Sequence, residues 1–165
     1  MTVETSLDES MNEIESQTLD TNHEREKEPP LVHRRSPRVL LAEDDLEMRR
    51  FLASALRLYG YEVTEAASGT EVLNRIGPYL YDGMEFDFDV IVSDIRMPGV
   101  DGLEILSGLR MCSGAPPVVL ITAFGDRRTH TDAERFGAVD VLDKPFDIAD
   151  LRAILQHVVP PIENS

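Results

Sequence analysis

The chain has 165 residues, of which 42% are hydrophobic and 28% are charged, a composition typical of a soluble globular protein with one main domain. Its formal net charge of −15 argues against direct binding of nucleic acid, because the phosphate backbone is itself negative. No apolar run reaches the roughly 18 residues that cross a bilayer, and the acidic N-terminus does not resemble a signal peptide, so we expect a cytoplasmic protein that contacts no membrane.

Residues 1–36 are predicted to form a disordered acidic N-terminal tail. They include nine acidic and four basic residues, they lack Phe, Tyr and Trp, and they end in a proline-containing stretch. Such a segment cannot bury enough apolar surface to offset the entropy that it would lose on ordering. The folded domain is accordingly predicted at residues 37–159, followed by a short C-terminal tail at 160–165 that begins with two prolines.

From Arg38 onward, short apolar runs alternate with amphipathic stretches. This pattern is typical of a parallel sheet that is covered by helices on both faces. Five runs rich in β-branched residues and bounded by turn signals predict strands at residues 39–42, 62–65, 90–93, 118–122 and 139–142. The fold class that we predict is α/β, a doubly wound five-stranded parallel sheet flanked by five helices.

The first three predicted helices have clear start signals. The first covers residues 46–59, between a capping Asp45 and a terminating Gly60. Its expected core-facing residues are Met48, Phe51, Leu52, Ala55 and Tyr59. The second and third helices begin at Ser68 and Asp101, each followed three residues later by a glutamate, as in a capping box.

The fourth and fifth predicted helices differ in their apolar content. The fifth, at residues 147–158, has a regular apolar face. The fourth, at residues 126–136, offers only Ala133 and Phe136 as clear apolar anchors. We therefore expect the fourth helix to be the least firmly packed and to be a candidate moving part.

Chemically active residues are predicted to gather at one edge of this sheet, because ligands of doubly wound sheets bind beyond the carboxyl ends of the strands. These residues are Glu43 and Asp44 after the first strand, Asp94 after the third, Thr122 at the end of the fourth and Lys144 after the fifth. Each residue alone has an ordinary explanation, such as a helix cap, a strand end or a surface charge. Their joint placement indicates a common site.

The combination of these residue types suits the transfer of a phosphoryl group to a carboxylate. Three carboxylates at one edge repel one another unless a divalent cation lies among them, and Mg²⁺ is a hard ion that binds carboxylate and phosphate oxygens. Asp94 is then the predicted nucleophile, and Glu43 and Asp44 help to hold Mg²⁺. Thr122 offers a hydroxyl donor, and Lys144 offers an ammonium for Asp94 and then for the product phosphate.

Four sequence pieces resemble the receiver domains of response regulators in two-component systems. They are VLLAED at 39–44, SDIRMPGVDG at 93–102, ITA at 121–123 and DKPF at 143–146, within a match that covers about residues 38–158. The residues of these pieces are most similar to those of receivers of the nitrogen-regulator and nodulation-regulator types. The resemblance implies a flavodoxin-like receiver fold.

The resemblance also implies a ligand set and partners. Mg²⁺ would be held by Glu43, Asp44, Asp94 and the backbone carbonyl of Arg96, and the bond between Lys144 and its following proline would be cis. Asp94 would take its phosphoryl group from a histidine kinase or a histidine phosphotransfer protein, and a downstream protein partner would read the change. Such a domain is not a conventional enzyme, although it assists its own phosphotransfer and autodephosphorylation.

The sequence departs from the family pattern in three places. Val141 stands where receivers usually carry Tyr or Phe, three residues before the lysine, so the usual aromatic switch cannot operate in its ordinary form. Extra residues at 77–86 predict an extended second helix and loop. No output domain follows Ser165, which leaves open a stand-alone protein or a fragment.

Two further positions bear on how long a phosphate would stay on Asp94. In the family, the residues two after the acceptor and two after the threonine control the access of water, and here they are Arg96 and Phe124. Phe124 cannot orient a water by hydrogen bonding, and Arg96 can pair with phosphoryl oxygens. We therefore expect slow self-dephosphorylation, unless Phe124 points to solvent or into the output surface.

Other functions fit the sequence less well. A phosphatase of the haloacid dehalogenase type needs a second aspartate two residues after its nucleophile, where this chain has Arg96. A nucleotide-binding domain would need a glycine-rich loop after the first strand. The remaining alternative is a pseudo-receiver, an interaction module that does not depend on phosphorylation, but such a domain would normally have lost Asp94, the acidic pair or Lys144.

Overall fold

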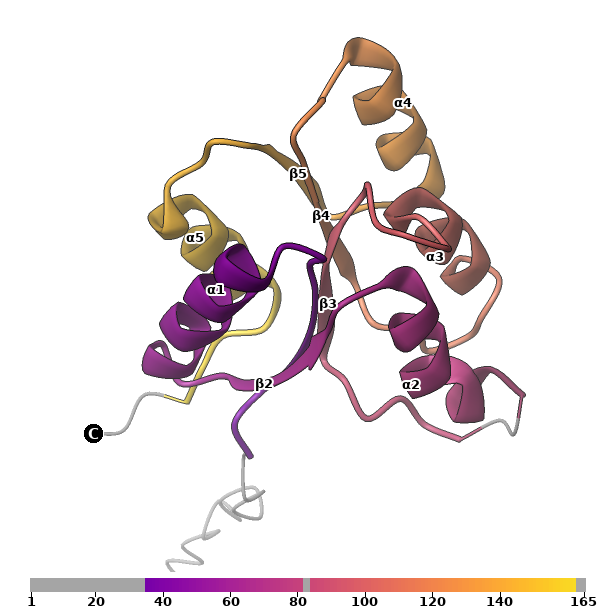
Figure 1. Ribbon diagram of the computed structural model, residues 1–165. Coiled ribbons are helices and arrows are strands. Elements are labelled where there is room, and N and C mark those ends of the chain that lie inside the picture. Colours follow the sequence, from indigo (N-terminus) through magenta and orange to yellow (C-terminus); the bar gives the residue numbers. More distant parts are fainter. Residues whose placement is uncertain (1–34, 82–83, 163–165) are drawn as a thin grey trace, which may run out of the picture. The chain divides into compact units, whose positions relative to one another are not determined.

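The computed structural model describes residues 35–81 and 84–162 (Figure 1). Most of the predicted N-terminal tail and residues 163–165 of the predicted C-terminal tail lie outside these ranges. Of the predicted N-terminal tail, Arg35 and Ser36 are described, and the Arg35 guanidinium pairs with Asp89 at 2.7 Å. In the described part of the chain, none of the helices has the length and apolarity that a membrane crossing requires.

The five predicted strands form one parallel sheet. In chain order they are β1 Arg38–Ala42, β2 Glu62–Ala66, β3 Val90–Asp94, β4 Val118–Thr122 and β5 Asp140–Asp143. The strand order across the sheet is β2-β1-β3-β4-β5, and each neighbouring pair is parallel. The predicted strand boundaries agree with these to within one residue.

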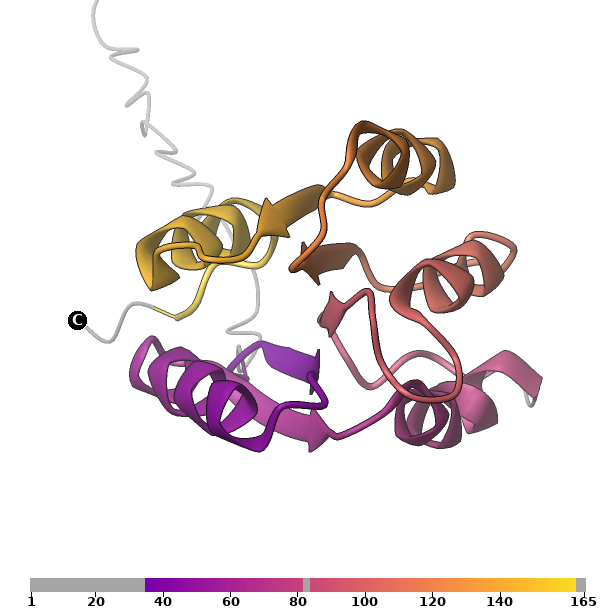
Figure 2. The same ribbon diagram turned by 45° about the horizontal axis from the view of Figure 1, so that its top comes forward.

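Five helices connect and flank the strands. They are α1 Leu46–Leu58, α2 Gly69–Tyr81, α3 Gly102–Leu109, α4 Arg127–Phe136 and α5 Ile148–Val158. Helices α1 and α5 cover one face of the sheet, and α2, α3 and α4 cover the other (Figures 1 and 2). The predicted doubly wound α/β fold is confirmed.

The buried residues form two clusters, one on each side of the sheet. Leu41, Leu52 and Leu151 belong to the cluster beneath α1 and α5. Leu40, Ile76 and Leu106 belong to the cluster on the opposite face, beneath α2, α3 and α4. Strands β1, β3 and β4 are almost fully buried because both of their faces are covered, which explains their continuous apolar sequences.

The predicted core face of α1 is wrong at Phe51. The buried residues of α1 are Leu52, Ala53 and Leu56, whereas Phe51 is 56% exposed. At 3.6 residues per turn, Phe51 lies about 140° around the helix from Leu56, on the side that faces away from the sheet. Met48 and Tyr59, which were also predicted to face the core, are half-buried and pack against this cluster.

Aspartates cap several of the helices. Asp45 accepts a hydrogen bond from the Met48 N–H at 2.7 Å, as predicted. Asp101 and Glu104 form the predicted reciprocal capping box at the start of α3. The start of α2 differs, because Glu71 accepts from the backbone N–H of residue 67 at 2.9 Å instead of from that of Ser68. The Ser68 hydroxyl still accepts from the Glu71 N–H at 3.2 Å.

The extra residues before β3 extend α2, as predicted. The helix continues to Tyr81, with Pro78 inside it. The ring of Tyr79 lies 5.5 Å from that of Phe86 and 6.4 Å from that of Phe88, measured between centroids. These aromatic contacts attach the end of α2 to the segment that leads into β3.

Helix α4 buries the fewest residues of the five helices in the described chain. Only Ala133 is buried in α4, whereas α1 and α2 each bury three residues, α3 buries four and α5 buries two. The expectation that α4 is the least firmly packed helix is therefore confirmed. That α4 is a moving part stays a prediction, favoured by its small number of buried residues.

Candidate functional site

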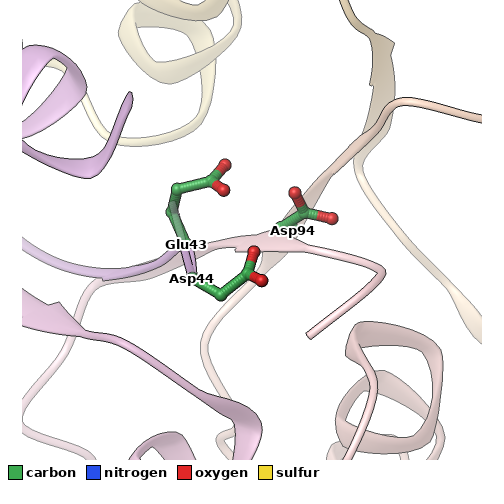
Figure 3. A group of neighbouring side chains, drawn as sticks. All are labelled: Glu43, Asp44 and Asp94. Atoms are coloured by element: carbon green, nitrogen blue, oxygen red, sulfur yellow. The ribbon is translucent and has the colours of Figure 1, made fainter. Parts of the chain in front are cut away.

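Three carboxylates converge at the carboxyl ends of β1 and β3. Glu43 and Asp44 directly follow β1, and Asp94 is the last residue of β3, the neighbouring strand in the sheet. One carboxylate oxygen of each residue lies within 4.8 Å of the others. Figure 3 shows the three side chains directed toward a common space. The structure thus brings together the three acidic residues that the sequence placed at this edge.

Lys144 joins two of these carboxylates. Its ammonium donates to the Glu43 Oε2 at 2.7 Å and to the Asp94 Oδ2 at 2.5 Å. The residue follows β5, and its backbone N–H donates to the Thr122 carbonyl at 2.7 Å. The bond between Lys144 and Pro145 is cis, as the family resemblance implied.

The electrostatics of the site favour a charged lysine between the two acids. Burial raises the pKa of the Glu43 carboxyl above its ordinary value, and the charge of Asp94 adds to this, while the hydrogen bond from Lys144 opposes it. Burial alone would lower the pKa of the Lys144 ammonium. Its hydrogen bonds to Asp94 and Glu43 outweigh burial, so its pKa is raised. The ammonium therefore stays protonated and balances part of the acidic charge.

The other oxygen of Asp94 is bound by the backbone of the loop after β3. The Arg96 N–H donates to the Asp94 Oδ1 at 2.7 Å, which brings the Arg96 backbone beside this carboxylate. The Arg96 side chain extends to the next loop, where its guanidinium lies over the ring of Phe124. Phe124 itself is 65% exposed, so its side chain is largely open to solvent, which is the exception to the expected slow self-dephosphorylation.

Thr122, at the end of β4, is fully buried. Its hydroxyl oxygen accepts a hydrogen bond from the Phe124 N–H at 3.1 Å. The hydroxyl is thus attached to the start of the β4–α4 loop, residues 123–126, which leads directly into the weakly packed α4. A change in the orientation of the Thr122 hydroxyl would therefore act directly on the Phe124 N–H in this loop.

The loop between β3 and α3, residues 95–101, is held by close backbone contacts. A Cβ atom at Gly102 would lie 2.6 Å from the carbonyl oxygen of Asp94, so only glycine allows this approach. Gly69, the first residue of α2, lies against the carbonyl of Val100 with no room for a side chain. The backbone next to Asp94 is therefore enclosed by α2 and α3.

Sequence reasoning missed two polar contacts beside the site. From α1, the Arg49 guanidinium donates to the Glu43 carbonyl at 2.7 Å. From α4, the His130 Nε2 lies 3.0 Å from a carboxylate oxygen of Asp143, the residue before Lys144. Each contact joins residues from different elements. Neither Arg49 nor His130 belongs to a sequence motif that would have drawn attention to it.

The donor set fits a hard divalent cation. Carboxylate oxygens are the ligands that Mg²⁺, Ca²⁺ and Mn²⁺ prefer, and three of them converge here. Asp44 is exposed, which leaves the site open to solvent on one side, while Glu43 and Asp94 are buried. The cluster can therefore bind a metal ion that keeps some of its waters.

The comparisons with known proteins identify the family. Residues 39–156 match the model of the response regulator receiver domain, and the chain belongs to this family of two-component systems. Over 122 residues it is 34% identical to the regulatory protein AtoC of Escherichia coli, a match that covers 74% of this chain and 25% of AtoC. The chain thus spans about a quarter of the length of that relative.

Solved receiver domains share the fold. The receiver domain of the Francisella response regulator 1452 is 30% identical, with a TM-score of 0.66 over 74% of this chain and 95% of that one. The response regulator TrrA of Thermotoga maritima, solved in complex with Mg²⁺ and BeF, is 25% identical, with a TM-score of 0.64 over 74% of this chain and 99% of that one. The predicted receiver resemblance is confirmed, and no finding supports a pseudo-receiver.

Proposed function

We propose that this receiver domain is a phosphoacceptor switch in which Asp94 takes a phosphoryl group from a phosphohistidine donor. The observation that carries the proposal is the position of Asp94, whose two oxygens are bound by Lys144 and by the Arg96 N–H within the acidic cluster. The donor would be a histidine kinase or a histidine phosphotransfer protein in the cytoplasm. A downstream protein would read the change, without direct contact of this acidic domain with nucleic acid.

The residues of the site supply the chemistry of an in-line transfer. A carboxylate oxygen of Asp94 forms a bond to phosphorus while the bond from phosphorus to the donor nitrogen breaks, and the leaving electron pair stays on the histidine. Glu43, Asp44, Asp94 and the Arg96 carbonyl would hold Mg²⁺, which neutralises the phosphoryl oxygens when it is bound. Lys144 then pairs with the product phosphate, and the Thr122 hydroxyl donates to it.

The output step follows from the weak packing of α4. Phosphorylation adds about 1.5 to 2 negative charges at the strand ends and attracts the Thr122 hydroxyl, while Lys144, which already contacts Asp94, pairs with the phosphate. Thr122 pulls on the β4–α4 loop through its bond with Phe124, and α4 follows because Ala133 is its only buried residue. A change from mostly inactive to mostly active needs roughly 5 kcal/mol of differential stabilisation. Without an aromatic ring at Val141, we expect activation to be incomplete.

We further propose that the domain is not a conventional enzyme, because the acidic cluster serves the transfer to its own Asp94. Its chemical activity is limited to assisting this transfer and the later loss of the phosphate. The bound phosphate leaves by attack of water at the same phosphorus, so the groups that surround Asp94 set the lifetime of the active state.

The central test is chemical phosphorylation. We expect the full chain, incubated with acetyl phosphate and Mg²⁺, to gain the mass of one phosphoryl group in an acid-stable, base-labile form. Asp94→Ala should abolish the gain, and Asp140→Ala, an exposed aspartate of β5, should leave it intact. A mass gain that persists in Asp94→Ala would overturn the proposal.

A further inference from the structure

Arg49 links three parts of the molecule around the acidic loop after β1. It lies in the first turns of α1, and its side chain is only 12% exposed. The Nη1 donates to the carbonyl of Glu43 at 2.7 Å and lies 3.4 Å from the carbonyl of Asp44. Its Nε lies 3.6 Å from the Oε2 of Glu65, near the end of β2.

The two carbonyls bound by Arg49 belong to residues that follow the last residue of β1 in the sheet ladder. Backbone carbonyls that leave a ladder need other donors, and a guanidinium supplies several in a rigid, planar arrangement. The same two residues carry two of the three carboxylates of the cluster. Their side-chain positions therefore depend on a loop whose backbone is fixed from α1.

Glu65 balances the charge of this arginine. Its Oε2 faces Arg49, and its Oε1 accepts from the Nη2 of Arg57 at 2.9 Å. Arg57 lies near the end of α1 and also donates to the carbonyl of Val63, but it has no contact with the acidic loop among its described hydrogen bonds. Arg49 and Arg57 thus share one partner, while only Arg49 reaches the carbonyls beside the site.

From this geometry we infer that Arg49 is a positioning residue for the metal site, because it holds the β1–α1 loop so that Glu43 and Asp44 face Asp94. The inference rests on the metal site of the proposed function and extends it to a residue outside the site. Two effects of Arg49 oppose each other. Its positive charge repels a divalent cation, whereas its hydrogen bonds fix two of the ligands. The two contacts with backbone carbonyls and the nearby Glu65 carboxylate, which balances the charge of Arg49, favour positioning as the larger effect.

Charge repulsion and ligand positioning change the metal affinity in opposite directions, so the direction of the change in an Arg49 variant shows which effect is larger. In the full chain without phosphodonor, Mg²⁺ affinity is measured by calorimetric titration, and Mn²⁺ affinity by the electron paramagnetic resonance signal of the free ion. We expect Arg49→Met to weaken the binding of both ions by roughly tenfold, the lower end of the range for residues that orient metal ligands. Arg49→Lys, which keeps the charge but has only one donor nitrogen, should fall between this variant and the parent.

Arg57→Met is the matched control, because it removes the other cation that binds Glu65 and leaves the acidic loop untouched. It should keep the Mg²⁺ affinity of the parent within about twofold. Unchanged or tighter Mg²⁺ binding in Arg49→Met would overturn the inference, since charge alone predicts tighter binding. If Arg49→Met does not fold, Arg49→Gln, which is also neutral and has a shorter side chain, decides, and Mg²⁺ binding equal to or tighter than that of the parent would count against positioning.

The metal titrations do not depend on phosphorylation of Asp94. If Asp94 took no phosphate but Arg49→Met still lost Mg²⁺ affinity, the proposed function would fail and the role of Arg49 would stand. If phosphorylation occurred and Arg49→Met bound Mg²⁺ as the parent does, the reverse would hold. If both the phosphoacceptor function and the positioning role of Arg49 are correct, raising the Mg²⁺ concentration should restore phosphorylation of Arg49→Met by acetyl phosphate.

Discussion

The guanidinium carbon of Arg96 lies 4.9 Å from the centroid of the Phe124 ring. The two residues come from the loop that follows Asp94 at the end of β3 and from the loop after the neighbouring strand β4. A cation over an aromatic face is attracted to it, so each residue restrains the other. The pair joins the two positions at which the family resemblance places control over the access of water.

This contact bears on the lifetime of a phosphate on Asp94. We predict that Phe124→Glu speeds the loss of phosphate severalfold, because a carboxylate orients water by hydrogen bonding and draws Arg96 into an ion pair. The decay of the phosphorylated protein, followed by intact mass after removal of the donor, measures the effect. The affinity for Mg²⁺ should not change.

Phe124→Leu provides the control for this prediction. Leucine keeps an apolar cover but removes the aromatic face, so the decay should stay within about twofold of the parent if exclusion of water dominates. A decay of Phe124→Glu that is equal to or slower than that of the parent would refute the shielding role of Phe124.

Removal of the Lys144 ammonium should destabilise the fold in a pH-dependent way. Lys144→Met leaves Glu43 and Asp94 as neighbouring acids without their cation, and we expect it to lower the free energy of unfolding by about 1–3 kcal/mol near neutral pH. Urea unfolding in the presence of a chelator measures this. Lys144→Arg, which keeps a cation, should lose less.

The sign of the pH dependence follows from the raised pKa of Glu43. An acid whose folded pKa lies above its unfolded pKa favours the fold at low pH, and this contribution is lost as the pH rises through the folded pKa. Without Lys144 that pKa rises further. The gap in stability between parent and Lys144→Met should therefore be smaller at about pH 5 than at about pH 7, and a gap independent of pH would contradict this origin.

The contact between His130 and Asp143 should restrain α4. The two side chains are partly exposed, so the pair is worth about 0.5–1 kcal/mol, or a two- to fivefold change in an opening equilibrium. We predict that His130→Ala speeds amide hydrogen exchange in α4 by this factor, while exchange in α5 is unaffected. His157→Ala, an exposed histidine of α5, should leave α4 exchange as it is in the parent.

A shortened chain tests the predicted N-terminal tail. A chain that begins at Arg35 keeps the pairing of Arg35 with Asp89, and we expect its melting temperature to stay within about 4 °C of that of the full chain. It should also be phosphorylated by acetyl phosphate at the same rate. A larger fall in melting temperature would show that residues before Arg35 stabilise the domain.

The sequence was sufficient to predict the fold because buried parallel strands leave a continuous apolar pattern. The five strands and the relative weakness of α4 were predicted from local patterns and match the structure. Phe51 was assigned to the wrong side of α1, because a large apolar residue next to Leu52 is expected to be buried from its residue type alone. The position of the sheet relative to α1 decides which side of the helix is buried. That position depends on strands that are distant in the chain.

The residues of the site were predicted for a similar reason, since each follows a recognisable strand. The contacts around them could not be predicted in this way. Arg49 meets Glu65 across α1 and β2, and His130 meets Asp143 across α4 and β5. Such pairs depend on the angle at which a helix crosses the sheet, which hydrophobic periodicity does not specify.

The glycines beside Asp94 have a consequence for the direction in which a signal travels. Gly102 and Gly69 let α3 and α2 lie directly against the β3–α3 loop, so we expect this side of the site to move little when charge is added. The neighbouring loop, after β4, leads from Thr122 into α4, whose one buried residue is Ala133. A phosphate added to Asp94 would therefore displace mainly the β4–α4 side of the site. Asp94 and its loop would stay in place, and the structural change would appear away from the site, at the surface of α4.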